Sequence, residues 1–194
     1  MEKRGVIILI ASFLLIISIA GFFLLNKNEN NGDKSLPSQS SFSEEARTLI
    51  HKDFKATISS GWNETEISPS IFVYLPPGAN PDDASTETII ITDSFFEENN
   101  LTLDQLLEKG IENSKATMPD LEIIENSEWK NHFFSGKEIK FTGTQDGIKR
   151  QFTQIYGIKY NTLYSITYSC AENNCKYNYV FNNLTVSFEP TIPK

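Results

Sequence analysis

The spacing of the hydrophobic positions changes along this 194-residue chain. The residues from Gly5 to Leu25 form one apolar run without a charge, and residues 26–41 are almost entirely polar. A helix of about 20 apolar residues crosses the hydrocarbon core of a bilayer. The run therefore predicts a transmembrane helix, and the polar segment predicts a flexible tether behind it.

Three later segments have the spacing of helices. The first is Ser43–Lys52, which predicts a short helix capped by Ser43 itself. The longest covers residues 103–116, with Thr102 as its N-cap and Gln105 completing a capping box. The last covers residues 174–183. The segments at residues 103–116 and 174–183 place their apolar side chains on one face, which predicts packing against a sheet.

Runs of β-branched and aromatic residues predict strands between these helices. The expected strands are residues 54–59, 67–75, 88–96, 121–130, 133–144, 149–158 and 162–169. Asp146-Gly147 predicts a two-residue hairpin turn between the two strands around it, and residues 159–161 predict a second turn.

Strands, a helix, four strands and a helix, in this order, are typical of an α+β domain in which helices pack on an antiparallel sheet. We expect this domain at residues 53–190. An anchor with a short cytoplasmic stub occupies residues 1–25, and the tether, with its possible short helix, occupies residues 26–52.

The residues that flank the apolar run predict its orientation. Lys3 and Arg4 precede the run, so the positive-inside rule leaves the N-terminus in the cytoplasm and the domain outside the cell membrane. A cleaved signal peptide is an alternative, with Ser18 and Ala20 as the small residues before the cut. A pilin-type leader cut after Gly5 is another.

The charge of the chain narrows the choice of partners. With 25 acidic and 17 basic residues, the net charge is −8. Such a chain repels nucleic acid, and no cluster of Lys and Arg offsets the repulsion. Nucleic acid is therefore excluded as a partner.

The two cysteines are Cys170 and Cys175. A close pair in an oxidising compartment predicts a structural disulfide, with free or redox-active thiols as the alternative. The two histidines, His51 and His132, lie far from the cysteines and from each other in the sequence. The four residues therefore lack the spacing of a structural metal site. We therefore expect neither a metal nor a cofactor.

Three sites fit the N-glycosylation acceptor pattern, at Asn63, Asn100 and Asn183. A chain this rich in Asn, Ser and Thr produces about three such sites by chance. They are glycosylation candidates only because the predicted compartment permits it.

The order of the elements and several short phrases together resemble the PsbP-like family. This is the fold of the extrinsic photosystem II subunit, shared with a Ran-binding import factor and with prokaryotic envelope proteins. The matching phrases are Gly61-Trp62, the helix at 103–116, the hairpin of 136–144 and 150–158, Leu163-Tyr164-Ser165-Ile166-Thr167-Tyr168 and Phe181-Asn182-Asn183-Leu184. The resemblance covers Phe54 to Phe188. It implies an α/β/α sandwich and a non-catalytic accessory module, and no site residue of the family maps onto this chain.

Motifs of catalysis are absent from the sequence. There is no nucleophile elbow, phosphate loop, dinucleotide fingerprint or zincin motif. His132 is the one neutral-pH base within the predicted domain. The acidic pairs Asp82-Asp83 and Glu97-Glu98 would suit glycoside hydrolysis, but they fall at predicted turns. We therefore predict no enzymatic activity, with an unrecognised hydrolase as an alternative.

Large aromatic side chains anchor many protein interfaces. Trp129 and Tyr160 lie near predicted strand ends and are the candidate partner surface, whereas Trp62 is expected in the core. The sequence as a whole predicts a non-catalytic module on the cell membrane that binds or helps assemble another envelope component. The alternative of another class is a pilin-like structural subunit.

Overall fold

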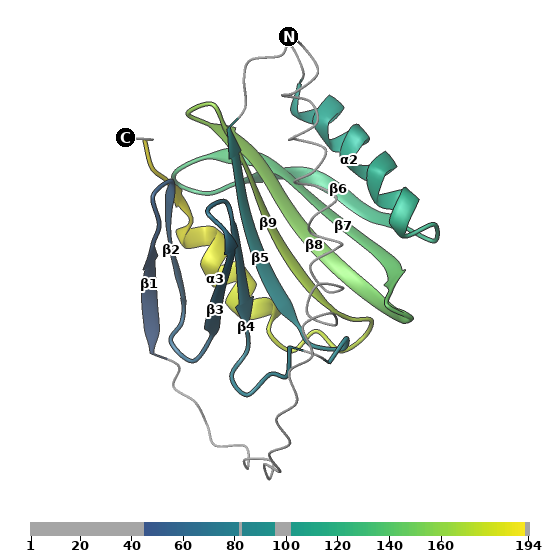
Figure 1. Ribbon diagram of the computed structural model, residues 1–194. Helices are drawn as coiled ribbons and strands as arrows, with labels where there is room; N and C mark the ends of the chain where they lie inside the picture. The colour runs from purple at the N-terminus through teal and green to yellow at the C-terminus, as the bar shows by residue number, and fades with distance from the viewer. Residues whose placement is uncertain (1–44, 82, 96–101, 193–194) are drawn as a thin grey trace.

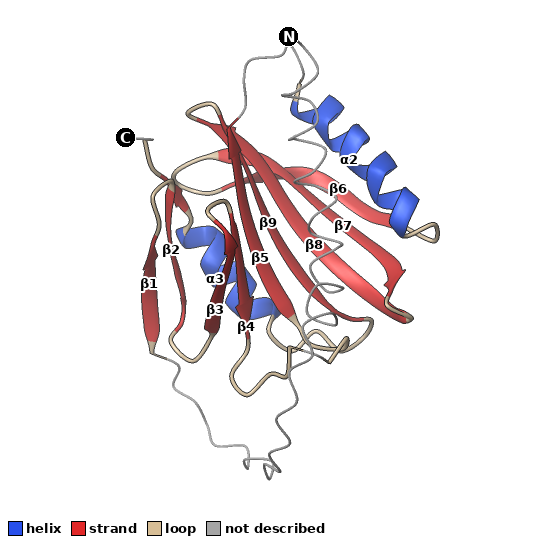
Figure 2. Ribbon diagram, in the orientation of Figure 1, coloured by secondary structure: helices blue, strands red, loops and turns tan. Residues whose placement is uncertain are grey.

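A seven-stranded antiparallel sheet forms the centre of the molecule (Figures 1 and 2). The computed structural model describes residues 45–81, 83–95 and 102–192, so the predicted transmembrane run lies outside the described residues. The strands stand in the order β3-β4-β5-β9-β8-β7-β6. Their bounds are β3 Asn63–Ser68, β4 Ile71–Leu75, β5 Thr88–Phe95, β6 Glu122–Lys130, β7 Ser135–Gln145, β8 Ile148–Lys159 and β9 Thr162–Ala171.

A small second sheet and two helices pack around this centre. The small sheet has the order β1-β2-β10 and is antiparallel throughout. The bounds are β1 Ala46–Ile50, β2 Phe54–Ser59, β10 Glu189–Pro190, α2 Leu103–Thr117 and α3 Asn178–Ser187. Helix α2 lies along the β6–β8 half of the large sheet, whereas α3 lies against β2 and β9 (Figure 1). The predicted α+β class with antiparallel pairing is thus confirmed.

Neither helix within the described residues combines the length and the apolar character that crossing a bilayer requires.

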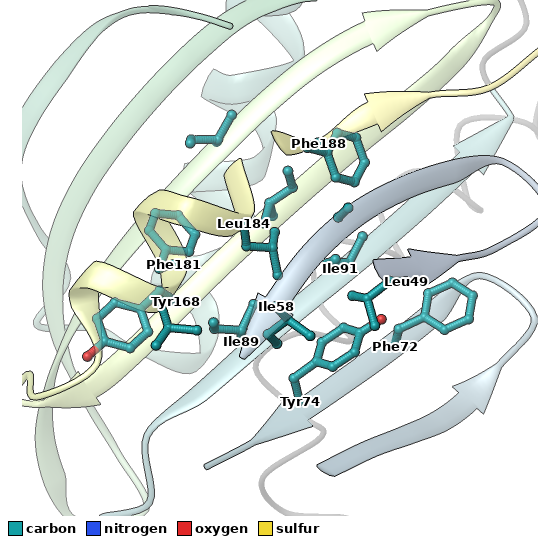
Figure 3. Packing of buried hydrophobic residues seen from close by; sticks show 14 of the residues in the cluster. Leu49, Ile58, Phe72, Tyr74, Ile89, Ile91, Tyr168, Phe181, Leu184 and Phe188 are labelled. Carbon is teal, nitrogen blue, oxygen red and sulfur yellow. The ribbon is translucent and has the colours of Figure 1, made fainter. Parts of the chain in front are cut away.

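The main hydrophobic core lies between one face of the large sheet, the small sheet and α3 (Figure 3). Because side chains alternate along a strand, Ile89 and Ile91 of β5 face this core while Ile90 between them faces the other way. The labelled members of the core are Leu49, Ile58, Phe72, Tyr74, Ile89, Ile91, Tyr168, Phe181, Leu184 and Phe188. Trp62 is buried in the same core, as the sequence predicts.

A second core seats α2 on the opposite face of the sheet. Leu107 of the helix packs with Met118 and Leu121, which follow it, and with the stacked rings of Phe141 and Phe152. The predicted capping box is present, since Thr102 and Gln105 exchange hydrogen bonds of 3.2 and 2.8 Å between side chain and backbone. The longest predicted helix is therefore confirmed.

The predicted helix at Ser43–Lys52 is wrong where the structure describes it, because residues 46–50 form strand β1. Ala46 pairs with Ser59 of β2, and the side chain of Leu49 is buried in the main core. Alternate residues thus face the core, which is the strand period rather than the helical one. The strand lies N-terminal to the predicted domain start at Asp53.

The predicted strand at residues 67–75 is two strands. The chain reverses at residues 69–70, and β3 pairs with β4 in an antiparallel hairpin. Strand β3 is largely polar and exposed because it is the edge of the sheet, so it lacks the apolar signal of a buried strand.

The predicted helix at residues 174–183 begins later, since α3 covers Asn178–Ser187. The physical reason is the Cys170–Cys175 disulfide, which closes residues 171–175 into a turn between β9 and the helix. The carboxylate of Glu87 accepts hydrogen bonds of 3.0 Å from the backbone N–H groups of both Lys176 and Tyr177, just before the helix. N–H groups at a helix start have no partner within the helix, so Glu87 caps α3 at its observed start.

The two turn predictions are confirmed by the backbone. Asp146 and Gly147 have φ angles of 51° and 77°, and Tyr160 and Asn161 have φ angles of 51° and 56°. Two successive residues in the left-handed region match the twist of a tight antiparallel hairpin. The disulfide prediction is borne out as well, because Cys170 and Cys175 are bonded across a Cα–Cα distance of 5.2 Å.

Candidate functional site

The two aromatic residues of the predicted partner surface lie in different environments. Tyr160 projects from the β8–β9 turn and is exposed. Trp129, near the end of β6, is only partly exposed, and its ring stands edge-on to Phe134 at 5.3 Å between centroids. Trp129 therefore contributes to packing, and Tyr160 is the member of the pair that remains available.

Four large apolar side chains are exposed at the end of the fold where Tyr160 lies, and we call this region the strand-end surface. Its members are Ile50, Phe95, Tyr160 and Ile192, with side chains between 44% and 73% exposed. Phe95 pairs with Thr162, two residues after Tyr160. These side chains come from four separate segments of the chain, so no local sequence pattern announces the surface.

Hydrogen bonds between loops hold the strand-end surface together. The hydroxyl of Tyr164 donates to the carbonyl of Asp53 at 2.8 Å, which ties β9 to the β1–β2 loop. Thr191 donates to the carbonyls of Asp53 and Lys52 through its backbone N–H at 2.9 Å and its hydroxyl at 2.8 Å. The C-terminal segment that carries Ile192 is thereby fixed beside the same loop.

The β6–β7 loop is anchored to the same end through one side chain. The amide nitrogen of Asn131 donates to the carbonyls of Thr185 and Phe188 at 2.9 and 2.8 Å. Its amide oxygen accepts from the backbone N–H groups of Phe133 and Phe134 at 2.7 and 2.9 Å. The ammonium group of Lys159 also donates to the carbonyl of Phe133. This end of the fold therefore presents its side chains from rigid supports.

A buried carboxyl lies beneath the strand-end surface. Asp93 of β5 is 5% exposed, and burial raises the pKa of its carboxyl to about 6, although a hydrogen bond with Ser70 acts in the opposite direction. The negative charge of Asp53 adds to the rise in the pKa. Ionisation of Asp93 at neutral pH therefore opposes folding.

Asp93→Asn is expected to stabilise the protein at neutral pH. Because the pKa of Asp93 is raised on folding, the folded state holds the proton more tightly, and the stability conferred by Asp93 is lost as pH rises from about 4 to about 6. A shift of this size corresponds to about 3 kcal/mol at most. Urea unfolding at both ends of this pH window measures the change, with the exposed Glu112→Gln as the matched control. If the free energy of unfolding had the same pH dependence in Asp93→Asn as in the unmodified chain, the raised pKa of Asp93 would be contradicted.

Strand β6 forms a second candidate surface, because it is the last strand of the large sheet among the described residues. A bulge between Ile123 and Glu125 leaves both Ile123 and Ile124 exposed. The backbone N–H and C=O groups along the outer side of such a strand can pair with another strand. We call this surface the β6 edge.

Ion pairs fix the β6 edge against its neighbours. Lys137 of β7 lies 2.9 Å from Asp104 of α2 and 2.9 Å from Glu128 of β6, and these hydrogen bonds raise the pKa of Lys137 to about 12. Lys140 lies 2.8 Å from Glu125. The carboxylates of Glu125 and Glu128 are thus engaged on the sheet, and the exposed isoleucines are the apolar part of the edge.

A cluster of titratable side chains joins the two sheets at His51. The Nε2 atom of His51 lies 3.1 Å from the hydroxyl of Tyr74 and 3.3 Å from the carboxylate of Glu64. The imidazole packs against the rings of Phe54 and Phe72, and this burial lowers its pKa. The contacts account for a packed structural histidine, and no Ser or Cys nucleophile takes part in them.

The remaining sequence candidates do not form a common site. Asn63 begins β3 and Asn183 lies on α3, both exposed, and Asn100 lies outside the described residues. His132 is exposed in the β6–β7 loop, with its ring 5.2 Å from that of Phe133. Across the described ranges, no group of three or more His, Cys, Asp or Glu side chains is placed to hold a metal ion.

The sequence missed most members of both surfaces. Phe95 closes an apolar run that predicts a buried strand, Ile192 stands among polar and proline residues, and Ile123 and Ile124 have the apolar character of a buried strand. The one local signal is the pair of adjacent isoleucines, since two consecutive residues of a strand point to opposite faces.

Comparison with known proteins identifies the fold and the family. The family model described as PsbP-like protein matches residues 6–189. No curated protein sequence matches the chain. The structure of cyanobacterial PsbP from Synechocystis is similar with a TM-score of 0.55 and 13% identity, covering 81% of this chain and 98% of that one.

Two further solved structures share the fold. The Ran-binding protein Mog1p of Saccharomyces cerevisiae has a TM-score of 0.55 and 8% identity, covering 76% of this chain and 96% of that one. LpqN of Mycobacterium tuberculosis, involved in cell envelope biogenesis, has a TM-score of 0.52 and 13% identity, covering 77% and 92%. Identities this low carry the architecture alone, whereas the family model extends over nearly the whole chain. The chain therefore belongs to the family of PsbP-like proteins.

Proposed function

We propose that the chain is a non-catalytic module, anchored in the cell membrane by residues 5–25, whose extracytoplasmic domain binds a protein component of the envelope. The β6 edge is the observation that carries the protein-binding part. It combines an open strand with two adjacent exposed isoleucines, Ile123 and Ile124. An extended segment of a partner that adds to such an edge gains backbone hydrogen bonds, and the exposed side chains supply specificity.

The relatives support this proposal at the level of the family. One similar structure is that of a Ran-binding protein and another is that of a protein involved in envelope biogenesis. None of the descriptions reported above names a catalytic activity. The titratable cluster at His51 is accounted for by packing and hydrogen bonds, which leaves the exposed surfaces as the candidate working parts.

Site-specific crosslinking in native membranes tests the proposal. A photoreactive amino acid replaces Ile124 in the full chain, and the control places it at Glu112, on the exposed face of α2. We expect a defined crosslinked protein from position 124 only, identified by mass spectrometry, and its loss when Ile123→Asp is added. The same products from both positions would overturn the role of the β6 edge.

The anchor is tested separately in the same membranes. An integral transmembrane helix resists alkaline carbonate extraction, so the full chain is expected in the membrane pellet. Recovery of the full-length chain in the soluble fraction would refute the anchor and favour the cleaved signal peptide.

A further inference from the structure

We infer that the strand-end surface docks on the lipid bilayer to which the chain is anchored. The inference rests on the membrane anchor of the proposed function. It begins from the apolar side chains at this end, since Ile50, Phe95, Tyr160 and Ile192 make up half of the eight large hydrophobic residues that are exposed in the described part of the chain. The other four lie on β6 and α3.

The residue types at this surface suit the boundary between water and lipid. Tyrosine favours the headgroup level, where its ring is in an apolar layer and its hydroxyl stays wet. Burying the side chains of isoleucine and phenylalanine away from water lowers the free energy by about 25 cal/mol per Å² of apolar surface. The surface therefore combines side chains that enter the acyl boundary with one that remains at the headgroups.

Two lysines lie at the same end. Lys52 is exposed in the β1–β2 loop, and the ammonium group of Lys159 lies 5.3 Å from the centre of the Tyr160 ring. Asp53 is the acidic residue of the same loop. Although the chain has a net charge of −8, charges more than about 10 Å from the bilayer are largely screened at physiological salt. The charges at the contact, which include those of Lys52, Lys159 and Asp53, therefore decide the local interaction with anionic lipid.

The anchor keeps this surface close to the bilayer. Nineteen residues, 26 to 44, separate the end of the apolar run from the first described residue, Glu45. A chain of this length spans at most about 65 Å when fully extended. The tether joins β1 at Ala46, whereas the strand-end surface lies at the other end of this strand, at Ile50. A strand of five residues is only about 15 Å long, so a tether of this reach still lets the surface touch the bilayer. Tethering raises the effective concentration of the strand-end surface at the bilayer to the millimolar range. At such a concentration even a weak contact with lipid is occupied.

Fluorescence quenching in vesicles tests the docking. The full chain is reconstituted in phosphatidylcholine vesicles with phosphatidylglycerol, and an environment-sensitive dye is attached to a single cysteine at Tyr160→Cys or Ile192→Cys. The native cysteines are bonded to each other and do not take the dye. Ala116→Cys, exposed on α2, is the matched control.

We expect spin-labelled lipid to quench the dye at positions 160 and 192 at least about twofold more than at position 116, and aqueous iodide to show the reverse order. Lys52→Glu is expected to reduce the ratio of docked to undocked molecules about fivefold in anionic vesicles, and Lys115→Glu on α2 is expected to leave it unchanged. Quenching by lipid and quenching by iodide are measured on the same samples.

Two results would overturn the inference. Equal lipid quenching at positions 160, 192 and 116 means that the surface stays in water. Protection from iodide without lipid quenching means that a protein, another copy or a partner, covers the surface instead. Carbonate extraction of the same vesicles reports the anchor independently, so failure of the docking is distinguishable from failure of the proposed function.

Discussion

Replacing Leu107 by aspartate is expected to lower the free energy of unfolding by about 4 kcal/mol or more. Leu107 is the buried leucine of α2 and packs with Met118 and Phe152 in the second core. The substitution removes this apolar contact and places a carboxylate among buried apolar side chains. Leu106, which is only partly buried, is expected to tolerate the same change better.

Chemical unfolding of the full chain in detergent measures the effect, with the fluorescence of buried Trp62 as a reporter of the main core. Ala116→Asp introduces the same charge on the exposed face of α2 and serves as the control. An unfolding midpoint of Leu107→Asp equal to that of the control would contradict the seating of α2 on the sheet.

Gly157→Ala is expected to cost about 3 kcal/mol, because the new methyl group has no room. A Cβ at this position would lie 2.2 Å from the ring of Phe134 and 3.0 Å from the carbonyl oxygen of Ser135. Gly136 on β7 is equally tight, since its Cβ would lie 1.7 Å from the carbonyl oxygen of Tyr156. Gly157 thus leaves room for Phe134 to pack into the main core, and Gly136 leaves room for the backbone of β8.

The same unfolding measurement tests this prediction. Ser135→Ala, an exposed position on the same pair of strands, is the matched control and is expected to change the stability little. A Gly157→Ala variant as stable as this control would show that the strands separate without cost.

The elements that the sequence predicts well are those with a local chemical signal. The capping box of Thr102 and Gln105 and the turn Asp146-Gly147 each specify their geometry within a few residues, and both are present in the structure. The apolar face predicted for the helix at residues 103–116 likewise contains the side chains that pack on the sheet, because a helix buries one face at a fixed spacing.

The elements that the sequence missed depend on contacts far along the chain. Residues 46–50 become a strand because β2 supplies a pairing partner and the core receives Leu49. The start of α3 is capped by Glu87, nearly ninety positions earlier, whose carboxylate accepts a hydrogen bond from the backbone N–H of Lys176. Neither the pairing with β2 nor the contact with Glu87 can be read from the local sequence pattern.

The candidate surfaces were harder to predict than the fold. Tyr160 was identified from its residue type and its position at a turn. Phe95 and Ile192 join it only because the strand order brings the end of β5 and the C-terminal segment to the same end of the sheet. Exposure of a hydrophobic side chain is a property of its neighbours in space, which a linear pattern does not contain.

The pairing of β5 with β9 also determines when this domain can finish folding. Phe95 pairs with Thr162, which is 67 positions later in the chain. A chain that emerges N-terminus first can pair β5 with β4 at once, but its other neighbour, β9, does not yet exist. In contrast, β6 to β9 form successive local hairpins. Long-range pairing of this kind is slow, and the waiting strand is prone to aggregate. The apolar segment Ile89–Ile91 therefore lacks one of its two pairing strands, and is open to aggregation, until residue 171 has been released.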